Sequence, residues 1–159
     1  MVTGIDDDHV ELACFEVRGQ LFGIDVQQIR EIARSQHATP LPRAPGLIEG
    51  VIDLRGAIIP VVDLGRALCG EPIADGRRAR IAIVEVEGLV FGLRVDAAAD
   101  VMAVAARDVE GPPLLVAQAG YEAVRAVVRR EAAPPVLVLS LEHLLESVYR
   151  SALATSAAR

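Results

Sequence analysis

Apolar and polar residues follow one another along this chain in short blocks that are typical of β-strands rather than of long helices. Two blocks, "LACFEVRG" and "IAIVEVEG", have the length of a strand, are rich in β-branched residues and end at a glycine. Runs of this kind, bounded by turn-forming residues, indicate half-buried strands joined by tight turns. We therefore predict a hairpin at each place, with turns at Gly19-Gln20 and Gly88-Leu89.

The two blocks belong to a longer internal repeat. Residues 11–32 align without gaps over residues 80–101 and share seven identities in 22 positions, among them the pair Phe22 and Phe91. Aromatic residues make up only 3% of the chain, so each of these two phenylalanines is a scarce source of buried area. We interpret Phe22 and Phe91 as the core anchors of two lobes.

A second correspondence pairs residues 57–68 with residues 134–145. In both segments an apolar run ends at a residue suited to begin a helix, Asp63 in the first and Ser140 in the second, and then continues at helical spacing. Aspartate and serine side chains accept hydrogen bonds from the free N–H groups of a first helical turn. We expect a short capped helix after each of these strands.

The stretch "GLIEGVIDLRGAIIPVVDL", residues 46–64, reads as a further hairpin with Arg55 at its tip. Gly56 supplies the positive φ that a two-residue turn requires, and the tip projects Arg55 into solvent. Pro60 has no N–H to donate, so its strand should lie at a sheet edge or carry a bulge at that point. Gly50 leaves room for a close backbone or partner, or marks a bulge.

The sequence pattern specifies the secondary structure of one connecting segment but not of another. "QQIREIAR", residues 27–34, fits a short helix or a continuing strand, and its periodicity leaves both open. The proline-rich "TPLPRAPG", residues 39–46, cannot form a central strand because proline removes ladder hydrogen bonds, so it is expected to be a crossing loop.

Together these elements predict a mainly β fold of two small five-stranded antiparallel barrels side by side, with short helices including a C-terminal one. We expect residues 1–159 to form a single domain with one sub-barrel over about 11–69 and another over about 80–146, and strand exchange between them is possible. The ends, 1–8 and 151–159, are rich in acidic or small residues and are expected to be frayed.

Composition narrows the class of protein further. Apolar residues are 52% and charged residues 24% of the 159 residues, which is enough for a packed core. The net charge of −6 repels nucleic acid. The longest uncharged run is too short to span a bilayer, so we expect a cytoplasmic protein without membrane insertion. Cys14 and Cys69 stand far apart and are expected to be two small apolar thiols, with no disulfide and no metal site.

Residues suited to catalysis do not form a recognisable set. The three histidines lie at no metal-ligand spacing, and there is no phosphate-binding or nucleophile motif. Glu49, Asp53 and Asp63 are candidate carboxylates, but solvation on a strand face or capping of a helix explains them without catalysis. We therefore expect a binding module with no catalytic residue, cofactor or metal; an enzyme using Glu49 and Asp63 in a groove between the barrels is the remaining alternative.

The segment "LPRAPGLIEGVIDLRGAIIPVVDLGRAL", residues 41–68, resembles the signature of the CheW-like family. "FGIDVQQIREI" upstream is also similar to the family pattern, and "FGLRVDAAADVM", residues 91–102, repeats part of it. The resemblance implies two five-stranded barrels packed side by side, in agreement with the repeat.

The same resemblance implies a function. Members of the family are chemotaxis scaffold adaptors that couple the cytoplasmic tips of chemoreceptors to the regulatory domain of a CheA-type histidine kinase in membrane-attached arrays, without catalysis. By motif position, Arg55 and Glu31 correspond to residues of receptor and kinase coupling. Ile29 corresponds to an apolar receptor contact, and Gly50 to the glycine before the hairpin. These four residues are the predicted partner-binding site.

The chain also departs from the family pattern. Ser140 replaces a capping aspartate, and Pro134 and Pro135 stand where a strand of the second barrel should begin. Asp53 adds a negative charge beside Arg55, and the sequence leaves open whether it holds the guanidinium or competes with Glu31 for it. An accessory module that binds only the kinase or other adaptors, in a non-flagellar chemosensory or motility pathway, is therefore the alternative function.

Overall fold

The computed structural model describes residues 9–114 and 123–157, and the side chains of these residues as far as 150. The strands are β1 (His9–Val17), β2 (Gln20–Asp25), β3 (Ile29–Arg34), β4 (Ile48–Leu54), β5 (Ala57–Asp63), β6 (Arg80–Val86), β7 (Leu89–Val95), β8 (Ala97–Ala105), β9 (Val109–Glu110), β10 (Val124–Arg130) and β11 (Ala133–Leu139). The helices are the 3₁₀ turns η1 (Val26–Gln28) and η2 (Ala106–Asp108) and the α-helices α2 (Leu64–Cys69) and α4 (Leu141–Ala157). The predicted mainly β class with a C-terminal helix is confirmed.

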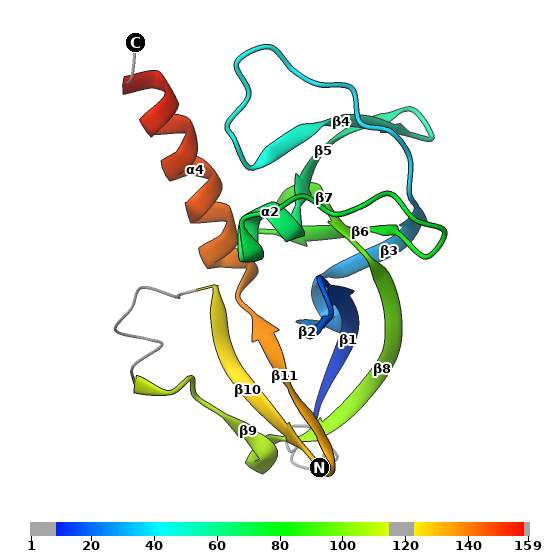
Figure 1. The fold of residues 1–159 in the computed structure, drawn as a ribbon, viewed down its shortest axis with the longest axis vertical. Helices are drawn as coiled ribbons and strands as arrows, with labels where there is room; N and C mark the ends of the chain where they lie inside the picture. Colours follow the sequence, from blue (N-terminus) through cyan, green and yellow to red (C-terminus); the bar gives the residue numbers. More distant parts are fainter. Residues whose placement is uncertain (1–8, 115–122, 158–159) are drawn as a thin grey trace.

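The strands form two sheets, and each sheet combines strands from both copies of the repeat (Figure 1). One sheet is six-stranded with the order β8-β1-β2-β11-β10-β9, and the other is five-stranded with the order β3-β6-β7-β5-β4. The β1–β2 hairpin of the first copy therefore lies among strands of the second, and the β6–β7 hairpin lies among strands of the first. The ranges 11–69 and 80–146 thus mark the sequence repeat, and neither sheet is one contiguous half of the chain.

The two sheets repeat the same pairing rules. In each sheet, the exchanged hairpin has one antiparallel and one parallel neighbour. The antiparallel pairs are β1 with β8 and β6 with β3, and the parallel pairs are β2 with β11 and β7 with β5. The remaining pairs are antiparallel. Each sheet is therefore mixed where the sequence predicted wholly antiparallel barrels, and one sheet has the two-residue β9 as a sixth strand.

Three hairpins close through the same kind of two-residue turn. Arg18-Gly19, Arg55-Gly56 and Glu87-Gly88 all have positive φ at both residues. Two consecutive positive φ values define the turn whose twist matches that of the flanking strands, and glycine at the second position lowers its cost. The first and third turns lie one residue earlier than predicted, because each glycine occupies the second rather than the first central position.

Phe22 and Phe91 are both buried, with 2% and 4% of their surfaces exposed. They belong to one apolar cluster that draws residues from both sheets and from α4, including Leu144 and Val148. Smaller clusters lie within each sheet. The two phenylalanines are therefore core residues, as predicted, but they anchor a shared core rather than two separate lobes.

Both predicted helix caps are present. The side chain of Asp63 accepts a hydrogen bond from the Arg66 N–H at the start of α2, and that of Ser140 accepts one from the His143 N–H at the start of α4. Helix α4 continues to Ala157, so the backbone of residues 151–157 is helical where the sequence predicted a frayed end. Residues 1–8 and 158–159 lie outside the described residues.

Strand β5 contains Pro60 at a position where only one of its two neighbouring strands pairs with it. It pairs with β4 through the proline, where Val51 stands opposite, but with β7 only from Val61 to Asp63. Pro60 therefore lies where β5 has a single partner strand, which agrees with the predicted local edge. At the other prolines, β11 forms despite Pro134 and Pro135, and its register with β10 shifts beside them.

Candidate functional site

The predicted site begins at the tip of the β4–β5 hairpin, where Arg55 projects with 70% of its side chain exposed. The turn holds Arg55 at φ 51° and Gly56 at φ 90°. The Asp53 carboxylate accepts a hydrogen bond from the Gly56 N–H at 2.8 Å and so closes the turn from beneath. The question left by the sequence is thereby answered: Asp53 stabilises the turn and makes no ion pair with Arg55.

Strand β3 supplies the partner of this arginine. The Nη2 group of Arg55 donates a hydrogen bond to the Glu31 carboxylate, whose side chain is 35% exposed. The segment left open as helix or strand is thus a strand preceded by the single 3₁₀ turn η1. Next to the pair, Arg30 forms an exposed ion pair with Glu85 at 3.4 Å. Charged groups at this edge of the sheet are therefore held in place by one another.

Apolar side chains surround the Arg55–Glu31 pair. A hollow of about 320 Å³ extends from it over Leu54, Ile59, Ile83 and Val90. Its rim includes Ile58, an isoleucine with 66% of its surface exposed. A surface of this kind combines directional donors and acceptors with exposed apolar area, and that combination is typical of sites that bind another protein. We refer to it as the Arg55 hollow.

The other two predicted site residues have different surroundings. Ile29 lies at the start of β3 and is half-buried, packed against the shared core. Gly50 is buried, and a Cβ atom at this position would lie 2.3 Å from the backbone oxygen of Thr39. Gly50 therefore has a structural role, and the partner contact predicted there stays a prediction. The glycine admits the Thr39 backbone, which bridges to Val51, and β4 also carries a register shift there.

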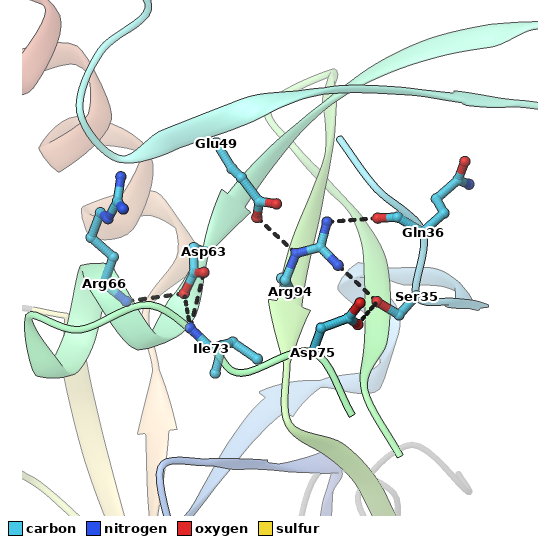
Figure 2. A network of polar contacts seen from close by, with 8 residues as sticks. All are labelled: Ser35, Gln36, Glu49, Asp63, Arg66, Ile73, Asp75 and Arg94. Carbon is cyan, nitrogen blue, oxygen red and sulfur yellow. Dashed lines mark hydrogen bonds and ion pairs between the residues drawn. The ribbon is translucent and has the colours of Figure 1, made fainter. Parts of the chain in front are cut away.

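Sequence reasoning missed a buried polar network centred on Arg94 of β7 (Figure 2). Arg94 is 6% exposed and donates hydrogen bonds to the Glu49 carboxylate at 2.7 Å, the Ser35 hydroxyl at 2.7 Å and the Gln36 carbonyl at 2.8 Å. It thereby ties β7 to β4 and to the end of β3. The signal was present in "LVFGLRVD", because an arginine inside an apolar strand requires a carboxylate partner.

The two carboxylates of the alternative enzyme hypothesis border one polar hollow of about 230 Å³. Glu49 is engaged by Arg94, and Asp63 accepts the N–H groups of Arg66 and Ile73 at 3.0 and 3.1 Å. Figure 2 shows these carboxylates turned towards their separate partners. Each carboxylate therefore has a structural role, and the pair is not arranged for acid–base catalysis.

Within the described ranges, no cluster of three or more histidine, cysteine, aspartate or glutamate side chains is arranged to bind a metal ion. Over the same part of the chain, no helix has the length and hydrophobicity needed to cross a membrane. The surface feature that includes the predicted residues Arg55 and Glu31 is the Arg55 hollow.

Comparison with known proteins identifies relatives of this arrangement. The model of the family described as CheW-like domain matches residues 11–149. The chain is 30% identical over 151 residues to Chemotaxis protein CheW of Treponema pallidum, covering 90% of this chain and 86% of that protein. It is 39% identical over 103 residues to Chemotaxis protein CheW of Rhizobium meliloti, covering 65% of this chain and 66% of that protein.

A solved structure shares the fold. The crystal structure of the scaffolding protein TtCheW from Thermoanaerobacter tengcongensis matches with a TM-score of 0.77 and 29% sequence identity, over 86% of this chain and 92% of that one.

Proposed function

The chain belongs to the CheW-like family, and we propose that it is a chemotaxis scaffold adaptor that couples the cytoplasmic tips of chemoreceptors to a CheA-type histidine kinase. It does so through protein–protein contacts and without catalysis. In this proposal the adaptor is cytoplasmic and is recruited to membrane-attached receptor arrays by its partners. The observation that carries the proposal is the Arg55 hollow, which presents an exposed ion pair beside exposed apolar side chains.

The chemistry of the hollow suits a reversible protein contact. A guanidinium has five N–H donors in a fixed fork, and one of its nitrogens already holds Glu31, which limits the motion of the group. Ordering such a side chain before binding reduces the entropy lost when a partner arrives. Exposed apolar residues such as Ile58 then supply area to bury, while the ion pair selects the orientation.

The proposal is tested by measuring two affinities separately with isothermal titration calorimetry. The full chain is titrated with a soluble fragment of a chemoreceptor tip from the same organism and, in a second experiment, with the regulatory domain of its CheA-type kinase. Binding to both is the expected result. Binding to the kinase domain alone would favour the accessory module, and binding to neither would contradict the adaptor function.

A further inference from the structure

A buried apolar cluster joins the Arg94 network to the Arg55 hollow inside the five-stranded sheet. Its members come from β3, β4, β5, β6 and the loop after β3, and they are Ala33, Ala38, Ile52, Ile59, Val61, Ile81 and Ile83. Leu54 and Val90 pack against this cluster and also border the Arg55 hollow. Arg94 stands opposite Ile81 in the β6–β7 ladder, four residues further along β7 than Val90. The cluster therefore has the hollow at one end and the buried arginine at the other.

The side chain of Arg94 points to the side of β7 that faces this cluster. Residues two apart on a strand share a face, so Val90, Gly92 and Arg94 point the same way. Val90 packs against the cluster, and a Cβ atom at Gly92 would lie 2.6 Å from the Ile81 side chain. The guanidinium thus enters the inner side of the sheet, where a charged group requires polar partners.

The partners of Arg94 lie on the two outermost strands of this sheet. Strands β3 and β4 end the strand order, and within the described residues no ladder of the sheet joins them. Arg94 connects them through side chains instead. It donates to Glu49 near the start of β4 and, just after the end of β3, to the Ser35 hydroxyl and the Gln36 carbonyl (Figure 2). One guanidinium therefore fixes the end of β3 against the start of β4.

The loop after β3 continues this connection. Thr39 and Val51 of β4 exchange two backbone hydrogen bonds, of 2.8 and 2.9 Å, and Ala38 between the loop and the sheet is 2% exposed. In the other direction along the chain, Glu31 precedes Ser35 by four residues. A movement of β3 relative to β4 would therefore shift the Glu31 carboxylate with respect to Arg55, which the β4–β5 hairpin carries.

We infer that Arg94 is a positioning residue for the Arg55 hollow. It holds β3 against β4 so that Glu31 reaches Arg55, and it thereby sets the orientation in which the ion pair meets a partner. Arg94 is 6% exposed and acts through Glu31 rather than by touching the partner. Arginine suits this role because its planar fork donates to several acceptors at once. The inference rests on the proposed adaptor function and adds a residue to its binding site.

The test is a double-mutant cycle of receptor affinity, measured by isothermal titration calorimetry with the receptor-tip fragment. The four proteins are the parent, Arg94→Met, Glu31→Ala and the double variant. Arg94→Met should weaken binding by about threefold to tenfold in the parent and by less than about twofold when Glu31→Ala is present, because no carboxylate then remains to be placed. The titrations use a temperature at which thermal melts show every variant to be folded, so that lost stability is not measured as lost affinity.

Val136→Ala is the control for lost stability. Val136 is fully buried in the cluster of the six-stranded sheet, so its truncation destabilises the fold without touching the Arg94 network. This variant should keep receptor affinity within about twofold of the parent. If Arg94→Met does not unfold cooperatively, Ser35→Ala and Glu49→Gln replace it, since each weakens one arm of the network.

Hydrogen exchange followed by NMR gives a second readout. In Arg94→Met the amides of Thr39 and Val51 should exchange faster relative to those of β1 and β2, because the opening between β3 and β4 is local. In Val136→Ala this ratio should not change. An unchanged ratio in Arg94→Met would show that the arginine does not hold the two strands together and would overturn the inference.

The affinities separate this inference from the proposed function. Unchanged receptor affinity in Arg94→Met would overturn the inference and leave the adaptor function standing. Equal losses with and without Glu31→Ala would show that Arg94 does not act through Glu31. An equal loss in Val136→Ala would assign the effect to stability alone. A parent chain that does not bind the receptor fragment would contradict the proposed function and the inference together.

Discussion

Arg55 and Glu31 form a hydrogen-bonded ion pair although β3 is at one end of its sheet's strand order and the β4–β5 hairpin is at the other. A contact between the two ends means that the sheet curls towards a closed barrel. The pair also places a cation from a hairpin tip beside a carboxylate on a strand that is far from it in sequence. Its members therefore have defined positions while remaining open to a partner.

Removing either member of this pair should affect binding far more than folding. Exposed ion pairs contribute about 0–1 kcal/mol to stability, so Arg55→Ala and Glu31→Ala should unfold within a few degrees of the parent in a thermal melt followed by circular dichroism. Both should bind the receptor-tip fragment more weakly. Arg129→Ala is the control, since Arg129 is also exposed and ion-paired, to Glu110, but lies outside the Arg55 hollow. A large fall in melting temperature for Arg55→Ala would show instead that the arginine is structural.

Gly50 should tolerate no side chain, for a reason internal to the fold. A Cβ atom would lie 2.3 Å from the Thr39 oxygen, and backbone must shift to relieve that contact. We expect Gly50→Ala to lower the free energy of unfolding by about 1–3 kcal/mol, as overpacking does. Gly76→Ala is the matched control, because a Cβ atom there meets nothing within 4 Å. Equal urea midpoints for the two variants would contradict a structural role for Gly50.

The contrast between Arg55 and Gly50 indicates what the sequence can predict about the site. The turn at Arg55 follows from local chemistry, because glycine after arginine between two apolar runs fixes the hairpin and its exposed tip. The role of Gly50 depends on Thr39, which returns from a loop after β3, and no local pattern specifies where that loop lies. The family resemblance named Arg55 and Glu31 as members of one site, whereas their ion pair and the turn contact of Asp53 are specified only by the folded structure.

Phe22→Ala and Phe91→Ala should each lower the free energy of unfolding by about 3–5 kcal/mol, because each truncation leaves a cavity in the packed core. Both side chains lie in the one cluster that joins the two sheets. Each variant should therefore shift the same cooperative transition in chemical denaturation. Leu114→Ala, at an exposed position, should change stability by less than about 0.5 kcal/mol. Two separate transitions, one for each phenylalanine, would show that the lobes fold independently.

The two cysteines should differ sharply in reactivity. Burial raises the pKa of the Cys14 thiol, an effect that Asp100 reinforces and Arg130 opposes, whereas Cys69 is exposed. A raised pKa leaves less thiolate at a given alkaline pH, and the thiolate is the reactive form. At about pH 8, Ellman's reagent should react rapidly with Cys69 and reach Cys14 only as the chain unfolds. Cys69→Ser should abolish the fast phase, and a fast phase that persists in this variant would contradict the burial of Cys14.

The exchange of hairpins between the sheets marks a limit of sequence reasoning on the fold. The repeat of residues 11–32 in residues 80–101 correctly indicates two equivalent hairpins, because similar local patterns form similar local structure. Which sheet each hairpin joins depends on the parallel pairs β2–β11 and β5–β7, whose partners are distant in sequence. Apolar strands of similar length satisfy either arrangement locally, so only the packed structure distinguishes them.

Arg94 offers the most direct test of the buried network. Replacing it in Arg94→Met removes the partner of Glu49 and leaves the Ser35 hydroxyl and the Gln36 carbonyl without their donor. Leaving one member of a buried ion pair without its partner is strongly destabilising. Because Glu49 keeps 30% of its side chain exposed, we expect the free energy of unfolding, measured in urea, to fall by about 3 kcal/mol.

The double variant Arg94→Met/Glu49→Gln separates the ion pair from packing. The double variant has no charged carboxylate left without a partner, so it should recover part of the lost stability. The effects of the two substitutions should therefore not be additive. Glu110→Gln, in an exposed pair with Arg129, provides the comparison and should change stability by less than about 1 kcal/mol. Strict additivity of the Arg94 and Glu49 substitutions would show that the two side chains stabilise the fold independently. In that case the network would not tie β7 to β4.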